Sequence, residues 1–378
     1  MKLDTRGLLL SVVVLSAQQS LAIEAPKANA PAPQPAAPAT QQPTPAASDE
    51  SAFYQRLQYS THFVNLRDLS VPNDVLVALS QGHADVAVNA LEASAAKGSS
   101  TANIALVRIQ HWCASALRPG EDPQKQIAAL PQDLAPERAA RAAGVINARA
   151  AFLPRAMNGC RDASFNYRAI EARLRSAAET GDAASATELA QFVRDPQQRE
   201  TLLKTAAAKN YAPALYATAT QHLMAVQRGQ TTEDVASIRL QLKQAGRTLA
   251  RARVDLANCM ALGCDGHPAD ALTAQAFGVD AARDGEPIAF LSMPRMPWGY
   301  RLSRAQLLGW QMFGDRLNEQ GCFGDEYVGA AIAFAQTIKG LEREQDPAVV
   351  DQGRATAQTL WKDNAERVMK ERGCADPR

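Results

Sequence analysis

The chain has 378 residues, of which 46% are hydrophobic, 21% charged and 6% aromatic, and its 40 basic side chains nearly balance its 39 acidic ones. Nucleic-acid-binding domains normally carry a strong basic excess, so this balance argues against a nucleic-acid partner. The length is sufficient for one large or two ordinary domains with a substantial core. We therefore expect the six cysteines to supplement that core and not to replace it.

The first 22 residues have the layout of a secretory signal peptide. Lys2 and Arg6 give a positive start, an apolar run of nine extends from Gly7 to Leu15, and small residues precede a cleavage position after Ala22. Nine helical residues cover about half of a ~30 Å hydrocarbon core, which disfavours a membrane anchor. We expect an exported protein, periplasmic or secreted, with no transmembrane span after cleavage.

Residues 23–50 form a segment with seven prolines, nine alanines and no aromatic residue. Such a segment cannot bury enough apolar surface to offset its ordering entropy, and its prolines favour an extended backbone. Two interpretations stay open, a tether that holds the folded part away from a partner and a tolerated disordered leader, and we favour the leader. Without residues 1–22 the chain has 38 basic and 38 acidic side chains, so long-range steering of a charged partner should be weak.

From Ser51 onward the apolar residues recur with a helical period. This period predicts one helix face with Val75, Leu76 and Leu79 and a following one with Val86, Ala90 and Leu91. No run of alternating β-branched residues with hairpin turn signals supports a strand. The sequence therefore predicts an all-α body, with helix boundaries marked at Pro72, Gly82, Gly98, Pro119-Gly120, Pro131, Pro136, Pro154 and Gly181.

A short unit recurs at four of the predicted helix ends, at 94–102, 177–185, 206–214 and 281–289. Its register is two small residues, two variable ones, Gly or Asn, three variable ones and another small residue. The small residues allow a neighbouring helix to approach closely, and Gly or Asn tolerates the left-handed conformation that ends a helix. The unit therefore predicts helical hairpins.

This unit resembles the helical hairpin of Sel-one-like and tetratricopeptide repeats, whose second helix typically ends in Ala-Ala before a glycine turn. Leu174 and Leu203 precede the small pair by three residues, as in those repeats, and 308–313 is similar to the Leu-Gly-x-x-aromatic stretch of a first helix. The turns lie 83, 29 and 75 residues apart, so the array would be degenerate. The resemblance implies a short α-solenoid of stacked helical hairpins over 51–290, continued by a helical region at 291–378. An ordinary Ala-rich helical bundle is the alternative.

The cysteines predict disulfide staples. Four of them follow glycine directly, and we expect each glycine to end a helix with the cysteine one residue beyond, at Gly159-Cys160, Gly263-Cys264, Gly321-Cys322 and Gly373-Cys374. Cys113 and Cys259 lie within helical patterns. Export implies an oxidising compartment, where the simplest sequential pairing is Cys113–Cys160, Cys259–Cys264 and Cys322–Cys374, one of about 15 possible connectivities.

Metal and redox chemistry have little support in the sequence. Cys259, Cys264 and His267 could supply three metal ligands, but a fourth is missing. Their spacing also matches neither covalent haem attachment nor a Cys-x-x-Cys redox motif. We therefore expect no metal and no cofactor.

The most unusual loop runs from Met293 to Tyr300. The thioethers of Met293 and Met296 would suit Cu(I), but two methionines are a weak signal, and a proline-rich loop that buries Trp298 in a core is the common case. The functional alternative is a partner-contact loop, because these residue types are enriched at interfaces. Its contact residues would be Met293, Arg295, Met296, Trp298 and Tyr300.

No catalytic residue can be assigned from the sequence. None of the five histidines lies in a zinc-protease, nucleophile-elbow or related motif, and no glycine-rich phosphate loop occurs. A non-enzymatic role is therefore favoured, that of a helical-repeat module for protein–protein interaction or scaffolding in the cell envelope, with an unknown protein partner there. The alternative is a cell-wall polymer-binding or cell-wall-degrading enzyme with an all-α body, which a cleft with converging carboxylates would support.

Overall fold

The computed structural model describes Phe53, Leu66 and the ranges 69–115, 122–229, 237–264 and 266–374. In this part of the chain the regular structure is helical and no strand occurs, which confirms the predicted all-α class. The predicted signal peptide, the linker and the helix boundary at Pro119-Gly120 lie outside the described residues.

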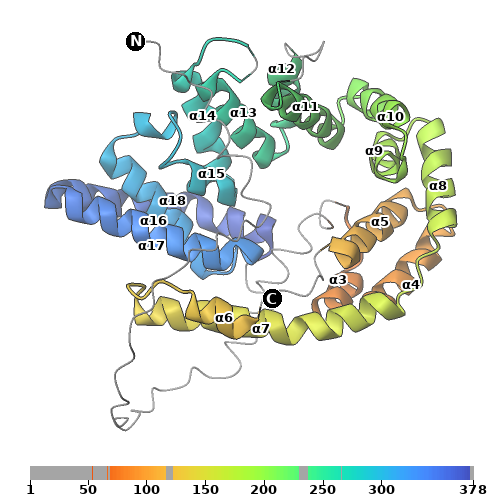
Figure 1. Cartoon of the computed structure of the whole chain (residues 1–378), viewed down its shortest axis with the longest axis horizontal. Helices are drawn as coiled ribbons and strands as arrows, with labels where there is room; N and C mark the ends of the chain where they lie inside the picture. The colour runs from red at the N-terminus through yellow and green to blue at the C-terminus, as the bar shows by residue number, and fades with distance from the viewer. Residues whose placement is uncertain are drawn as a thin grey trace, which may run out of the picture. The chain divides into compact units, whose positions relative to one another are not determined.

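The helices follow one another with short connections (Figure 1). The first group comprises α3 (Asn73–Ser80), α4 (Ala84–Ala95), α5 (Ser100–Ser115), α6 (Pro123–Ala128) and α7 (Pro136–Asp162). The middle group comprises α8 (Tyr167–Glu179), α9 (Ala183–Phe192), α10 (Pro196–Ala208), α11 (Ala212–Gln227), α12 (Ser237–Ala245), α13 (Ala250–Leu262) and α14 (Ala271–Arg283). The last group comprises α15 (Pro287–Ser292), the 3₁₀ turn η4 (Gly299–Arg301), α16 (Arg304–Glu319), the 3₁₀ turn η5 (Gly324–Glu326), α17 (Tyr327–Glu344) and α18 (Pro347–Arg372).

Neighbouring helices pack against each other as hairpins. Each helix from α8 to α14 contacts the next one along the chain. In the first group α3 contacts α4 and α4 contacts α5, and in the last group α16 packs against both α17 and α18. The body is therefore a stack of helical hairpins, as the recurring unit predicts.

The turns between these helices have the predicted backbone conformation. Each copy of the recurring unit places its Gly or Asn at positive φ, with values of 93° at Gly98, 96° at Gly181, 59° at Asn210 and 74° at Gly285. In the fourth copy Ala281, Ala282 and Ala289 are fully buried. The small residues thus let the adjoining helices approach closely, which was the physical reason for expecting them there.

Several helices begin at a side-chain cap. Asp182 illustrates this, because its carboxylate accepts the backbone N–H of Ser185 at the start of α9 and also the hydroxyl of Ser100 in α5. Burial alone would raise the pKa of Asp182, but these hydrogen bonds reverse the effect and leave the pKa below its usual value. The remaining caps whose side chains accept a backbone N–H are Asp122, Asn166, Asp195, Asp270, Ser303 and Asp346.

Two hydrophobic clusters provide most of the core. One is built from α3, α4, α5, α8 and α9 and extends from Leu66 to Val193. The larger one extends from Ala219 to Cys374 and contains a group of aromatic rings around Phe290, whose centroid lies 5.7 Å from that of Phe323. Because this cluster runs across residue 290, the C-terminal helices share one core with α11 to α15.

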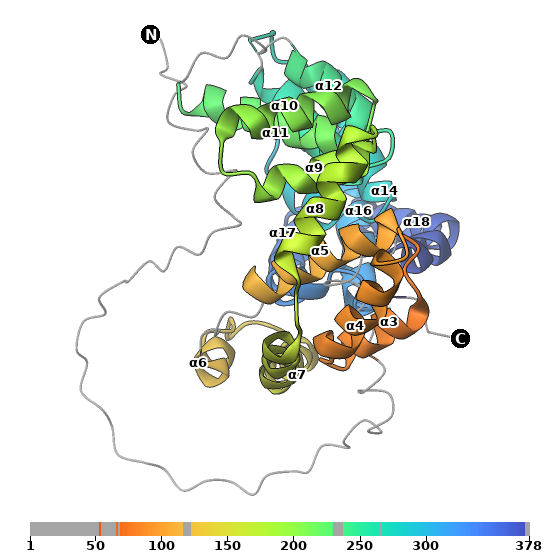
Figure 2. The ribbon, with the colours of Figure 1, turned by 90° about the vertical axis from the view of Figure 1, so that its right-hand side faces the viewer.

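The long helix α7 departs from the sequence prediction at two points. Pro154 was expected to mark a helix boundary and Gly159 to end a helix, but both lie inside α7. The role of Gly159 is close packing, since a Cβ there would lie 2.2 Å from the carbonyl oxygen of Gly82 and 2.8 Å from the backbone nitrogen of Ala84. Figure 2 shows α7 beside α3 and α4, and it is this contact that requires a residue without a side chain.

Gly159→Ala is expected to destabilise the protein by about 2 kcal/mol or more, because its methyl group meets backbone atoms that cannot rotate away. The matched control is Gly340→Ala in α17, where a Cβ meets nothing within 4 Å. There the better helix propensity of alanine should stabilise by up to about 1 kcal/mol. Urea denaturation of both variants tests the pair, and an equal response of the two would contradict the packing role of Gly159.

Candidate functional site

Three disulfides connect helix ends. The bonded pairs are those of the sequential pairing, with Cα–Cα distances of 5.6 Å for Cys113–Cys160, 4.9 Å for Cys259–Cys264 and 5.0 Å for Cys322–Cys374. Three of the four Gly-Cys pairs have the expected geometry, with glycine at positive φ beyond a helix, at 263, 321 and 373. Disulfides of this kind are typical of an oxidising compartment.

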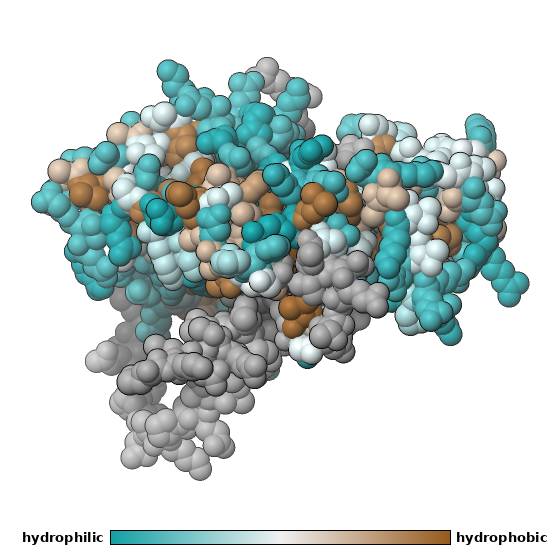
Figure 3. Space-filling view, turned by 90° about the horizontal axis from the view of Figure 1, so that it is seen from above, coloured by the Kyte–Doolittle hydropathy of each residue, from teal (hydrophilic) through white to brown (hydrophobic). Residues whose placement is uncertain are grey.

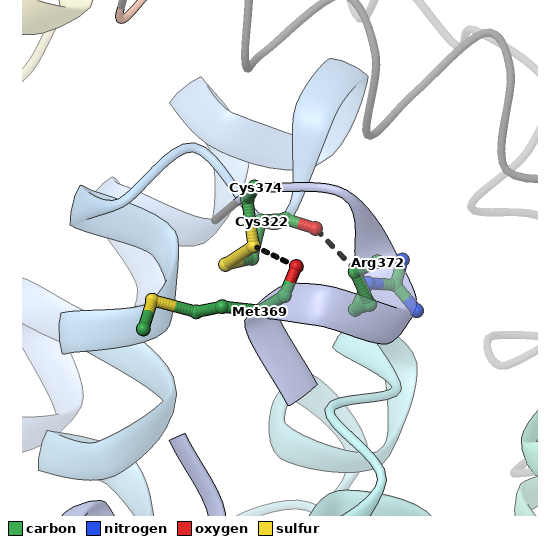
Figure 4. The surroundings of a disulfide bond; sticks show 4 residues. All are labelled: Cys322, Met369, Arg372 and Cys374. Carbon is green, nitrogen blue, oxygen red and sulfur yellow. Dashed lines mark hydrogen bonds between the residues drawn. A yellow bond between two sulfur atoms is a disulfide. The ribbon is translucent and has the colours of Figure 1, made fainter. Parts of the chain in front are cut away.

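The Cys322–Cys374 bridge is enclosed by protein. Its two cysteines are 0% and 1% exposed. Figure 4 shows that Arg372 lies beside the bridge, where its Nε donates to the carbonyl oxygen of Cys322 at 3.0 Å. The backbone N–H of Cys374 bonds to the carbonyl of Met369 at 2.9 Å. The end of α18 is thus tied to the segment after α16 by the disulfide and by the hydrogen bond from Arg372.

The loop 293–300 is mostly interior. Met293 and Trp298 are 0% exposed and Met296 is 3% exposed, so these three side chains form part of the core and are not available to a partner. The indole N–H of Trp298 donates to Asn258 Oδ1 at 2.9 Å, and its ring fills the space above Gly278, where a Cβ would lie 2.6 Å away. Met293, Met296 and Trp298 are of residue types enriched at interfaces, but in this structure their side chains pack in the core.

Arg295 and Tyr300 remain on the surface of this loop. Tyr300 is 66% exposed, and its hydroxyl donates to the carbonyl oxygen of Arg295 at 2.8 Å. Of the five residues proposed from the sequence for partner contact, only these two present their side chains to solvent.

The Cys259, Cys264 and His267 group does not assemble as a ligand set. Both sulfur atoms are consumed in the disulfide, so neither is available as a thiolate. Across the ranges that the structure describes, no group of three or more His, Cys, Asp or Glu residues is arranged to hold a metal ion.

A buried ion pair lies where α7 meets α16. The guanidinium of Arg138 forms two hydrogen bonds with the carboxylate of Asp315, whose side chain is 9% exposed, and it lies 3.9 Å from Glu319. Burial raises the pKa of Asp315 above its usual value, although Arg138 opposes this, and burial also raises the pKa of Glu319. The hydrogen bond to Asp315 raises the pKa of Arg138 in turn. These two residues are 177 positions apart in the chain, so the sequence contains no local signal for the pair.

Apolar contacts flank that ion pair. Val145 in α7 and Tyr327 at the start of α17 form a small buried cluster with Phe53 and Val328 packed against it. Burial, the largest effect, raises the pKa of Tyr327 to about 12. Further along α7, Arg149 lies 3.7 Å from Asp325 in η5.

Two further sets of charged side chains connect helices, one between α11 and α13 and the other between α18 and the start of α15. The hydroxyl of Tyr216 donates to Asp255 at 2.7 Å, and Arg251 lies 3.6 Å from the same carboxylate. Arg372 lies 3.8 Å from Glu286. Both carboxylates are therefore engaged with neighbouring donors, an arrangement that favours a structural role over general acid–base catalysis.

Two pockets are lined by charged side chains, and the first of them includes Arg138 of the buried ion pair. One, of 220 Å³, lies between the segment 131–138 and α17, where it is lined by Leu134, Arg138, Ile332, Ile338 and Lys339 among others. The other, of 340 Å³, lies along a single face of α8 and has charged walls. Each pocket has two carboxylates in its lining, and three of these four form ion pairs, Asp133 with Lys339, Glu342 with Arg354 and Glu171 with Arg175.

Four large apolar side chains are exposed at one end of the α11–α14 stack. Met224 lies near the end of α11, Leu240 near the start of α12, Leu262 at the end of α13 and Leu272 near the start of α14, and they are 39%, 57%, 39% and 63% exposed. Consecutive helices in this stack alternate in direction, so all four positions fall at the same end. Figure 3 looks down on the top of Figure 1 and shows brown apolar areas interrupted by hydrophilic ones.

Among the described residues, no helix is both long and apolar enough to span a membrane. Comparisons with protein families and with curated proteins find no match for this chain.

Among solved structures, the chain is similar to a protective antigen present in uropathogenic Escherichia coli strains, described as displaying an SLR fold. The identity is 12% and the TM-score is 0.44, and the likeness covers 78% of this chain and 60% of the antigen. The chain thus spans less than two thirds of the length of that protein. Because this TM-score is low, the evidence for stacked helical hairpins is the packing of consecutive helices and the conformation of the turns between them.

Proposed function

We propose that this protein is an exported helical-repeat module that binds a protein partner and acts in interaction or scaffolding in the cell envelope. Its stacked helical hairpins support this role, because such stacks create extended surfaces that usually bind protein segments. The three disulfides support export into an oxidising compartment.

The exposed apolar end of α11–α14 carries the proposal. Leu240 in α12 and Leu272 in α14 are more than half exposed, and α13 lies between these two helices in the chain. Burying an apolar side chain of this size against a partner is worth about 1.5–3 kcal/mol, so clustered exposed side chains of this kind mark interaction surfaces. A partner with apolar residues of its own fits this end of the stack.

The test is capture of a partner from native envelope after crosslinking, with the wild-type chain and with Leu240→Glu/Leu272→Glu. We expect the wild type to recover a specific protein and the double variant to lose about 90% or more of it, because two charges would be buried at the interface. The matched control is Val86→Glu, since Val86 is 53% exposed but lies in α4. Retention by the double variant, or binding of purified cell-wall polymer without any protein, would overturn the proposal.

A further inference from the structure

The first half of α7 meets the C-terminal helices through a single face. Arg138, Ala142, Val145 and Arg149 are spaced by four, three and four residues, so they lie on one side of the helix. Ala142 is 0% exposed and Val145 is 6% exposed. These four residues are named the α7 docking face.

The surface that receives this face is acidic. It consists of Asp315 and Glu319 at the end of α16, Asp325 in η5 and Tyr327 at the start of α17. These four residues are named the acidic docking surface. Figure 1 shows α7 running below this group of helices, and α7 contacts α17 directly.

The two surfaces are complementary along their length. Arg138 pairs with Asp315 at one end, and Arg149 lies 3.7 Å from Asp325 at the other. Val145 packs with Tyr327 between them. An amphipathic helix binds in a groove through apolar anchors on one face, and here charged pairs flank such an apolar contact at both ends.

One end of this contact is open to water, whereas its apolar centre is buried. The side chains of Arg149 and Asp325 are 50% and 43% exposed, so their attraction is screened and contributes little. The neighbouring pair of Asp133 and Lys339 is 65% and 66% exposed. The 220 Å³ pocket beside Arg138 leaves further space between the start of α7 and α17. The enclosed part of the contact comprises the apolar centre with Val145 and Tyr327 and the pair of Arg138 with Asp315.

The second half of α7 is held much more firmly. Cys160 joins it to α5, and Gly159 is packed against the backbone of Gly82. Pro154 separates the two halves and has no N–H, so the helical hydrogen bond to the carbonyl of Ala150 is missing at this position. Opening of the first half, beginning at the exposed Arg149 end, would therefore leave the second half anchored.

We propose that the acidic docking surface is a binding site for an arginine-bearing amphipathic helix, that α7 occupies it within the chain, and that a partner helix of the same chemistry replaces α7. Such a helix carries Arg at two positions eleven residues apart, with small or β-branched residues between them on the same face. This inference rests on the proposed function and names one partner-binding site for it, away from the α11–α14 end.

The probe is a fluorescent peptide with the sequence of residues 136–152, titrated against the disulfide-bonded chain and followed by fluorescence anisotropy. In the wild type α7 competes with the peptide. The double variant Arg138→Glu/Arg149→Glu repels α7 from the acidic docking surface, so it should bind the peptide at least about tenfold more tightly. Adding Asp315→Arg and Asp325→Arg to that variant should restore docking of α7 and return peptide binding to the wild-type level or below.

The matched control changes two exposed arginines of the same helix beyond Pro154. The variant Arg155→Glu/Arg161→Glu keeps the charge change but leaves the docking face intact, and should bind the peptide as the wild type does. A peptide in which Arg138 and Arg149 are both replaced by glutamate should bind neither the wild type nor the Arg138→Glu/Arg149→Glu variant. Equal binding of the unchanged peptide by these two chains, or binding of the glutamate peptide to either of them, would overturn the proposal. Neither result would affect partner capture through Leu240 and Leu272.

Hydrogen exchange in the unmutated chain provides a second measurement, which needs no variant to fold. Amides in residues 140–152 should exchange about tenfold faster or more than those in 156–162, because only the first half of α7 opens locally. Equal protection of the two halves would show that α7 does not leave its surface, and would also overturn the proposal.

Discussion

Removing the bridge at the end of α18, by Cys322→Ala with Cys374→Ala, is expected to lower the free energy of unfolding by about 4 kcal/mol, because the bridge restricts the unfolded chain over a long loop. The two cysteines are 52 residues apart and almost fully buried. Without the bridge, α18 keeps its packing on α16, but its last turn loses the covalent link to the segment after α16.

The control is the double variant Cys259→Ala/Cys264→Ala, in which the same chemical change opens a loop of only 5 residues. Its expected loss is about 2 kcal/mol on the same chain-entropy argument. Urea denaturation with fluorescence detection measures both losses. A loss at Cys322–Cys374 no larger than that at Cys259–Cys264 would contradict the prediction.

Helix ends were predictable where the signal is local. Gly98, Gly181, Asn210 and Gly285 end helices because a left-handed residue is needed at each of these positions, and the neighbouring residues are enough to indicate it. Gly159 has the same appearance in the sequence, but its absence of a side chain serves a contact with Gly82, which is far away in the chain. Local sequence cannot distinguish these two uses of glycine.

Helix faces in alanine-rich segments were harder to predict. In α4 the expected face included Val86 and Ala90, but Val86 is 53% exposed and Ala90 is also exposed, while Ala87 and Val88 are fully buried. Alanine is compatible with either face, so the pattern in this helix leaves its rotation undetermined. Packing against α3 and α5 determines it instead.

The contact between α7 and α16 depends on residues that lie far apart in the chain. Arg138 and Asp315 each lie in a helix with ordinary charged neighbours, and only the folding of the chain brings them together. The spacing of Arg138, Ala142, Val145 and Arg149 was a signal available in the sequence, but it is shared by many amphipathic helices. Only the structure shows that this helix face lies against Asp315 and Asp325.

Trp298→Ala is expected to destabilise the protein by about 3–5 kcal/mol, the range for removing a large aromatic side chain from a core. The ring is 0% exposed and packs tightly over Gly278, so the surrounding helices cannot collapse into the space without moving α14. The variant also leaves Asn258 without the donor that now lies 2.9 Å from its Oδ1. Thermal and urea denaturation measure the effect.

Tyr300→Ala is the matched control in the same loop, because Tyr300 is 66% exposed and its removal should change stability by about 0.5 kcal/mol or less. Trp298→Phe separates packing from hydrogen bonding, since it retains most of the ring but strands Asn258, and about 1–3 kcal/mol should be lost. If Trp298→Ala weakened partner capture without lowering stability, the loop would be a contact surface after all. The large stability loss that we expect instead follows from the position of Trp298 inside the core, where a side chain can support a surface but cannot itself reach a partner.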